Sequence, residues 1–121
     1  MVKLLNLGMQ NAVAFEMRGK ITKEDMELIL NDARTKIEKY GEIVILKQIE
    51  SFDGIELEAL YEEFQYLHEM GISNIKKVAV VSDKKWIEKI VALENEIFSN
   101  IEIEYFDFGD IVNAMFFLNQ K

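Results

Sequence analysis

Apolar residues follow a strand-like pattern in five short stretches of the chain. Residues 2–7 and 12–18 flank a glycine-containing connection of hairpin length, which predicts two antiparallel strands. Apolar and more polar residues alternate in the second of these, so we expect one buried face and one partly exposed face. Residues 42–49 and the first half of residues 76–89 are continuous apolar runs, typical of strands buried on both faces. Residues 101–106 form a last predicted strand.

Apolar residues at helical spacing lie between these strands. The first helix is predicted to begin at a capping box formed by Thr22 and Asp25 and to end at Gly41. A second helix is predicted to begin at about Ile55, with Asp53 as its cap, and to end at Gly71. Two further helices are predicted to begin at residues 82–83 and 107–109.

The predicted order of elements is β-β-α-β-α-β-α-β-α. Strands that alternate with helices indicate parallel pairing through right-handed crossovers, and the opening hairpin adds an antiparallel pair. We therefore predict an α/β fold, with one mixed sheet covered by helices in a single domain over residues 1–121. In such sheets ligands bind outside the carboxyl ends of the strands, so residues 76–89 mark the first place to look for a site.

The composition narrows the classes of function. A formal net charge of -8 opposes general attraction to nucleic acid, and no nucleic-acid partner is predicted. The absence of cysteine excludes disulfides and thiolate chemistry. No apolar run reaches the roughly 18 residues of a membrane-spanning helix, and the first residues do not resemble a signal sequence. We expect a cytoplasmic protein for which peripheral contact with a membrane is not predicted.

Basic residues are concentrated in one part of this acidic chain. Five of the fourteen lie within residues 76–89, which also hold Trp86. One interpretation is a site for an anion or a phospholipid headgroup, held by lysines and helix N–H groups beside the indole. The alternative is an ordinary capped helix with a solvated edge and a tryptophan that packs in the core.

A second group of residues is rich in aromatic side chains and methionine, and includes Tyr61, Phe64 and Phe98. Such residues can line an adaptable apolar pocket, or they can form a filled core or a dimer face. The single histidine, His68, has no catalytic or metal-binding companions at recognisable spacing. The sequence therefore predicts no enzyme, no metal site and no cofactor.

Several motifs together resemble the SpoIIAA-like family, which belongs to the wider STAS and SEC14/CRAL-TRIO-like group. They are Gly19-Lys20-Ile21-Thr22, Phe52-Asp53-Gly54, residues 77–88 with the string Asp83-Lys84-Lys85-Trp86-Ile87-Glu88, and Tyr105-Phe106-Asp107. The resemblance implies a STAS-like fold and, by analogy with lipid carriers, an apolar pocket between helices and sheet. Related anti-sigma-factor antagonists carry a phosphorylatable serine where this chain has Asp53, so the phosphoserine switch does not transfer.

Two hypotheses follow. The first is a non-enzymatic binding or carrier module for a lipid or other amphipathic small molecule, with its site between the second and third helices and the sheet. The second is a regulatory interaction domain without the phosphoserine switch, which docks on a protein partner or on a second copy as a homodimer. The predicted ligand-binding residues are Phe52, Asp53, Tyr61, Phe64, Ser82, Asp83, Lys84, Lys85 and Trp86.

Overall fold

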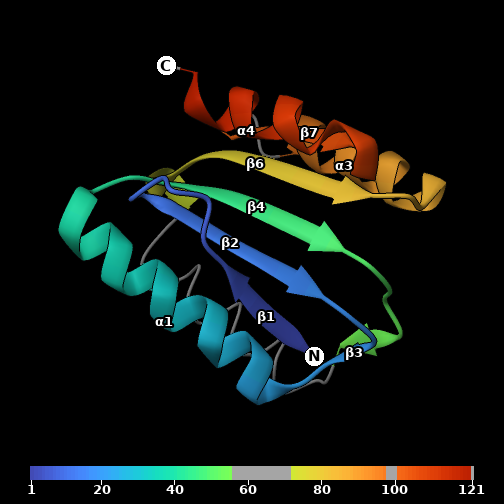
Figure 1. Ribbon diagram of the computed structural model, residues 1–121, viewed down its shortest axis with the longest axis horizontal. Coiled ribbons are helices and arrows are strands. Elements are labelled where there is room, and N and C mark those ends of the chain that lie inside the picture. The colour runs from blue at the N-terminus through green and yellow to red at the C-terminus, as the bar shows by residue number, and fades with distance from the viewer. Residues whose placement is uncertain (56–71, 98–100, 121) are drawn as a thin grey trace.

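A five-stranded mixed sheet organises the protein. The computed structural model describes residues 1–55, 72–97 and 101–120. The strands of the sheet are β1 (Val2–Leu5), β2 (Ala12–Met17), β4 (Ile43–Ile49), β6 (Ile75–Ser82) and β7 (Glu102–Phe106). They lie in the order β1-β2-β4-β6-β7, with β1 antiparallel to β2 and the remaining pairs parallel (Figure 1). The predicted mixed sheet and opening hairpin are confirmed.

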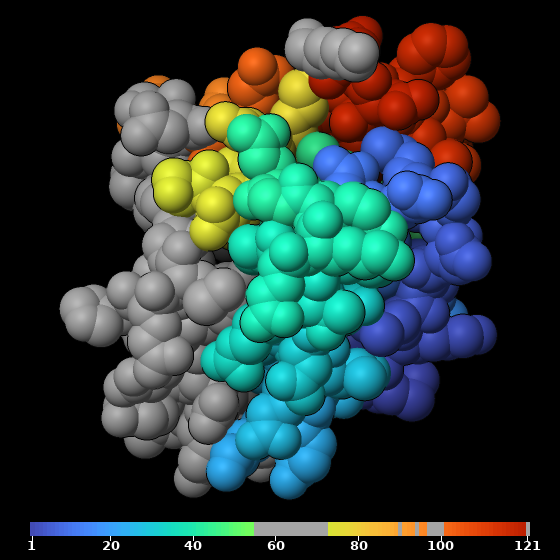
Figure 2. All heavy atoms as spheres, turned by 90° about the vertical axis from the view of Figure 1, so that its left-hand side faces the viewer, coloured from blue at the N-terminus to red at the C-terminus, as the bar shows by residue number. Residues whose placement is uncertain are grey.

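The order of the strands explains where the helices lie. Each strand of the sheet is added beside the preceding one, and crossovers of one hand then place their helices on the same face. Helices α1 (Lys23–Tyr40) and α3 (Lys85–Ile97) both contribute to one core, in which Leu30 and Val91 join Val13 and Val80 from the sheet. Figure 2 shows α1 lying along this side of the molecule.

The opposite face of the sheet is covered by α4 (Ile111–Asn119), which follows the short 3-10 turn Phe108–Asp110. Phe117 and Leu118 of this helix pack with Ala14, Leu46 and Val81 in a second core. Ala14 is consequently only 1% exposed. The prediction of a partly exposed face on β2 is therefore wrong at this position, because the last helix returns to cover it.

Two very short strands form a second sheet beyond the carboxyl ends of the main strands (Figure 1). They are β3 (Lys20–Ile21) and β5 (Gly54–Ile55), which pair in parallel. Gly54 and Ile55 thus belong to a strand, so the prediction that Asp53 caps a helix directly after it is wrong. The rest of that predicted helix, with Tyr61, Phe64 and His68, lies outside the described residues.

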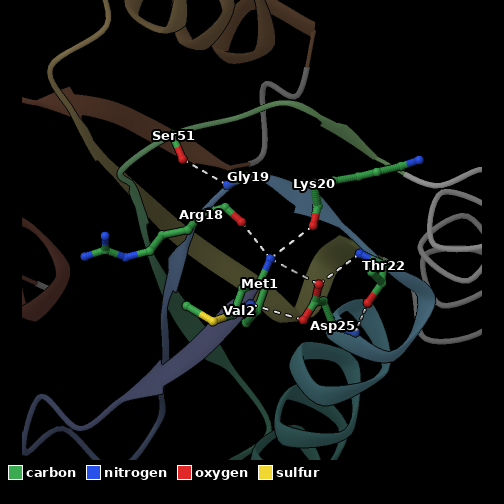
Figure 3. Close-up of polar contacts among 8 residues, drawn as sticks. All are labelled: Met1, Val2, Arg18, Gly19, Lys20, Thr22, Asp25 and Ser51. Atoms are coloured by element: carbon green, nitrogen blue, oxygen red, sulfur yellow. Dashed lines mark hydrogen bonds and ion pairs between the residues drawn. The ribbon is translucent and has the colours of Figure 1, made fainter.

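The start of α1 has the predicted cap. Thr22 Oγ1 accepts a hydrogen bond from the Asp25 N–H, and Asp25 Oδ2 accepts one from the Thr22 N–H. Asp25 Oδ1 also accepts the N–H of Val2, and Oδ2 lies 3.4 Å from the Met1 ammonium group (Figure 3). One carboxylate therefore joins the first helix to the edge strand β1.

The helix ends at Gly41, whose φ of 83° requires the left-handed region that glycine adopts without strain. The chain then reverses into β4. A 3-10 turn at Ile72–Asn74 leads into β6. None of the helices within the described ranges is long and apolar enough to cross a membrane.

Candidate functional site at the carboxyl ends of β4 and β6

The neighbouring strands β4 and β6 bring two predicted segments to the same edge of the sheet. Phe52 and Asp53 follow β4, and Asp83 to Trp86 follow β6. The ring centroids of Phe52 and Trp86 lie 6.3 Å apart in a tilted arrangement. These side chains are 38% and 47% exposed, so the alternative of a core-packed tryptophan is wrong. Two exposed aromatic rings in contact form the apolar part of the candidate site.

Ser82 lies beneath this surface and has a structural role. Its side chain is fully buried, and its hydroxyl donates to the Ile49 carbonyl at 3.1 Å and accepts from the Lys84 N–H at 3.3 Å. The phenol of Tyr105 donates to the Ser82 carbonyl at 2.8 Å. Ser82 therefore ties together the ends of three strands. Its hydroxyl is already bonded within the fold, unlike the surface side chains that follow it.

A tyrosine surrounded by carboxylates lies beside this turn. Burial raises the pKa of the Tyr105 phenol, and the negative charges of Asp107, Glu88 and Asp83 raise it further. Asp107 Oδ1 lies 3.4 Å from the same hydroxyl and is a second, more distant acceptor for its one proton. This end of the sheet consequently carries negative charge close to the lysines. In the part of the chain that the structure describes, these residues do not form a group able to hold a metal ion.

The predicted basic cluster is divided by the length of β6. Lys76 and Lys77 lie at the amino end of this eight-residue strand, and Lys84 and Lys85 follow its carboxyl end. At about 3.3 Å per residue the two pairs are separated by roughly 25 Å. Lys84 pairs with Asp83 at 3.2 Å, which leaves Lys85 as an exposed cation beside Trp86. The five lysines therefore do not belong to one anion site.

Lys77 is buried on the side of the sheet that α4 covers. Its ammonium group donates to the Phe117 carbonyl at 3.0 Å and lies 5.0 Å from the centre of the Phe117 ring. Only 9% of its surface is exposed. A cation at the last turn of a helix meets carbonyls that have no partner within the helix. Lys77 therefore fastens α4 to the sheet. The sequence did not indicate this role, because Lys77 stands beside Lys76 in a basic segment.

The loop after β4 is held against the turn that precedes β3. Ser51 Oγ accepts the Gly19 N–H at 2.9 Å, and the Asp53 N–H donates to the Gly19 carbonyl at 3.0 Å. Gly19 has a φ of 66°, which disfavours any side chain there. The same crossing brings the exposed Lys20 to this edge, a residue that we did not predict as part of the site (Figure 3). Tyr61 and Phe64 lie outside the described residues.

The side chains at this edge are of kinds that bind ligands. It combines two exposed aromatic rings, the exposed cations Lys85 and Lys20, and the exposed carboxylates of Asp53 and Asp83. Hydrogen bonds among backbone groups, Ser51 and Ser82 fix the loops that carry these side chains. The arrangement suits a ligand that has both an apolar part and polar groups.

Comparison with known proteins identifies similar sequences and folds. Residues 12–119 match the family model described as SpoIIAA-like. The crystal structure of an uncharacterised protein from the DUF3478 family of Shewanella loihica PV-4, with a SpoIIAA-like fold, superimposes with a TM-score of 0.73 at 24% identity. The match covers 98% of this chain and 92% of that one. A search among curated proteins found no match.

Proposed function

The chain belongs to the SpoIIAA-like family, and on that premise we propose that it is a non-enzymatic binding module for a lipid or other amphipathic small molecule. The observation that carries this proposal is the exposed contact between Phe52 and Trp86 at the carboxyl ends of β4 and β6. An acyl chain gains free energy when it covers such rings, because apolar surface is removed from water. The indole also suits a boundary between apolar and polar groups.

The charges around these rings favour a headgroup that carries both signs. Lys85 and Lys89 are exposed on α3, and Lys89 is one helical turn from Trp86. The carboxylates of Asp53 and Asp83 are exposed on the adjoining loops. A purely anionic headgroup would meet repulsion from these carboxylates, whereas a zwitterionic one can pair with both signs. We therefore expect phosphocholine lipids to bind at least as well as phosphoglycerol lipids.

Calorimetric titration of the whole protein with monomeric lysophospholipids tests the proposal. The two probes are lysophosphatidylcholine and lysophosphatidylglycerol, and native mass spectrometry gives the stoichiometry. We expect one bound lipid, and at least tenfold weaker binding after Trp86→Ala. Leu28→Ala, which removes an apolar side chain of similar exposure from α1, is the matched control. The absence of heat and of a bound mass with both lipids would refute the proposal.

A regulatory interaction domain is the second candidate, and the position of Asp53 favours it. This carboxylate is exposed on the loop where related antagonists carry their serine, and it is a permanent negative charge. Ser51 is held by the Gly19 N–H in the same loop. A protein partner that binds this carboxylate should be captured by the native chain, and its capture should be lost with Asp53→Asn. Capture that is unchanged by this substitution would exclude the loop as the docking site.

A further inference from the structure

Two large apolar side chains protrude from the outer side of α4. Val112 and Phe116, one helical turn apart, are 65% and 67% exposed, more than any other large apolar side chain that the structure describes. None of the nine residues from Ile111 to Asn119 is acidic or basic, although a surface helix normally places charged residues on its outer side. Val112 and Phe116 therefore form an exposed apolar stripe.

A hollow of about 560 Å³ continues the stripe towards β7. Its lining comes from the last strand and the last helix, and consists of Glu104, Phe106, Asn113, Phe116, Phe117 and Gln120. The rings of Phe106 and Phe117 are 5.7 Å apart and provide aromatic surface within it. A partner that covers Phe116 can thus place an apolar side chain in the hollow beside it.

The segment that carries the stripe and the hollow has only acidic charges. Residues 101–120 contain no lysine or arginine, and their four acidic side chains are all exposed, namely Glu102, Glu104, Asp107 and Asp110. None of the four forms an ion pair in the part of the chain that the structure describes. Asp110, at the N-cap of α4, also makes no capping hydrogen bond. These carboxylates are therefore available to a cationic partner.

Carboxylates lie at both ends of the apolar stripe. Asp110 precedes Val112 by two residues, and Glu104 lines the hollow together with Phe116. An apolar stripe with a negative charge at each end is complementary to a helix whose apolar face is bordered by lysine or arginine. A second copy of this chain, with its net charge of -8, would instead be repelled, as would an anionic membrane. The charges therefore select a basic partner.

We propose that the outer side of α4 docks a basic amphipathic helix of a protein partner. The apolar side chains of that helix cover Val112 and Phe116 and enter the hollow, and its basic side chains pair with Glu104 and Asp110. The occupant is a short segment, because α4 has nine residues and is only about 13 Å long. This inference is independent of the lipid-binding proposal, which concerns the carboxyl ends of β4 and β6.

Fluorescence anisotropy of the full chain with a synthetic peptide tests the inference. The probe is a labelled helical peptide of about 14 residues, with leucines at i, i+3 and i+4 spacing on one face and lysines on the other. A scrambled peptide of the same composition keeps the charge but loses the apolar face. The native protein should bind one amphipathic peptide, at least about tenfold more tightly than the scrambled one.

Two pairs of variants locate the bound peptide. Phe116→Ser should weaken binding at least about tenfold, whereas Leu93→Ser, at an exposed leucine of α3, should leave it unchanged. Circular dichroism of both variants should stay native because both side chains are largely exposed. Glu104→Gln should weaken binding several-fold, whereas Glu38→Gln removes the same charge from an exposed position of α1 and should not.

Equal binding of the two peptides, or equal effects within either pair of variants, would overturn the inference, because the net charge alone would then explain the attraction. The absence of peptide binding would overturn it as well. Dimerisation of the chain alone that Phe116→Ser abolishes, measured by sedimentation velocity, would assign the stripe to a second copy instead. Binding of lysophosphatidylcholine that is lost with Phe116→Ser but kept with Trp86→Ala would assign it to a lipid.

Discussion

Replacing Lys77 by methionine tests the contact that fastens α4 to the sheet. Methionine keeps an unbranched apolar stem of similar length and removes the ammonium group. The Phe117 carbonyl then loses its donor at 3.0 Å and, among the described residues, retains the longer bond, 3.4 Å, from the Gln120 N–H. The contact between the ammonium group and the Phe117 ring is lost at the same time. Both losses act on the same turn of α4.

The expected loss of stability follows from these contacts. A hydrogen bond that involves a charged group contributes about 1.5–3 kcal/mol, and a cation near an aromatic ring adds about 0.5–2 kcal/mol. Methionine offsets part of this because an uncharged side chain avoids the cost of withdrawing an ammonium group from water. We expect the free energy of unfolding to fall by about 1–3 kcal/mol. With an unfolding entropy of about 2.1 cal/mol/K per residue over 121 residues, the melting temperature should fall by about 4–12 °C.

Urea unfolding followed by circular dichroism measures the effect, and Lys76→Met is the matched control. Lys76 directly precedes Lys77 in β6, but both side chains of its ion pair with Glu42 are exposed. Such pairs contribute about 0–1 kcal/mol, so the control should change little. Hydrogen exchange should show the α4 amides losing protection in Lys77→Met. A Lys77→Met protein as stable as the native one would refute the assigned role of this lysine.

Three further predictions concern other contacts of the fold. Burial raises the pKa of the Asp25 carboxyl, but hydrogen bonds from Thr22 and Val2 and the nearby ammonium group outweigh it, so the pKa is lowered. Asp25→Asn should lower the free energy of unfolding by about 0.5–2 kcal/mol at neutral pH. The difference between native and variant proteins should shrink as the pH falls below about 4, towards the folded pKa. A difference that persists unchanged to about pH 2 would contradict the role of the charge. Ser82→Ala should cost about 1–2 kcal/mol in urea unfolding, since the Ile49 carbonyl loses its buried donor, and an unchanged midpoint would show that this bond contributes nothing. Tyr105→Phe should cost about 0.5–1.5 kcal/mol. Because the folded pKa of this phenol is raised, its contribution to stability is complete below about pH 10 and is lost as the pH rises further. The stabilities of the native and variant proteins should therefore converge above about pH 10. A difference in stability that stays constant above this pH would contradict the role of the phenol.

The main elements of the fold could be predicted because their signals are local. The capping box of Thr22 and Asp25 and the glycine at position 41 lie within a few residues of the helix ends that they define. The hairpin of β1 and β2 follows from two apolar runs and a short connection. The pairing of β3 with β5 escaped prediction because each has two residues, too few to show a period, and their partners are distant in the chain.

The candidate site was predicted in part. Phe52 and Trp86 were both among the predicted ligand-binding residues, and the structure places their rings in contact. Proximity in sequence was misleading for Lys77, which lies beside Lys76 in the chain but points into the face covered by α4. Ser82 was expected to face a ligand, yet its hydroxyl bonds to a neighbouring strand. Side-chain direction at the end of a buried strand depends on contacts that a local pattern does not contain.

The order of strands in the main sheet has a consequence for synthesis. Apart from the short pair β3 and β5, every strand lies beside the one made just before it. A chain that emerges from the ribosome at about 5–20 residues per second can therefore add each strand to an edge that already exists. The face that α4 covers stays bare throughout this growth, because that helix follows the last strand. The interval before α4 emerges is thus when a nascent chain presents Leu46, Val81 and their neighbours to water, and when protection by chaperones matters most.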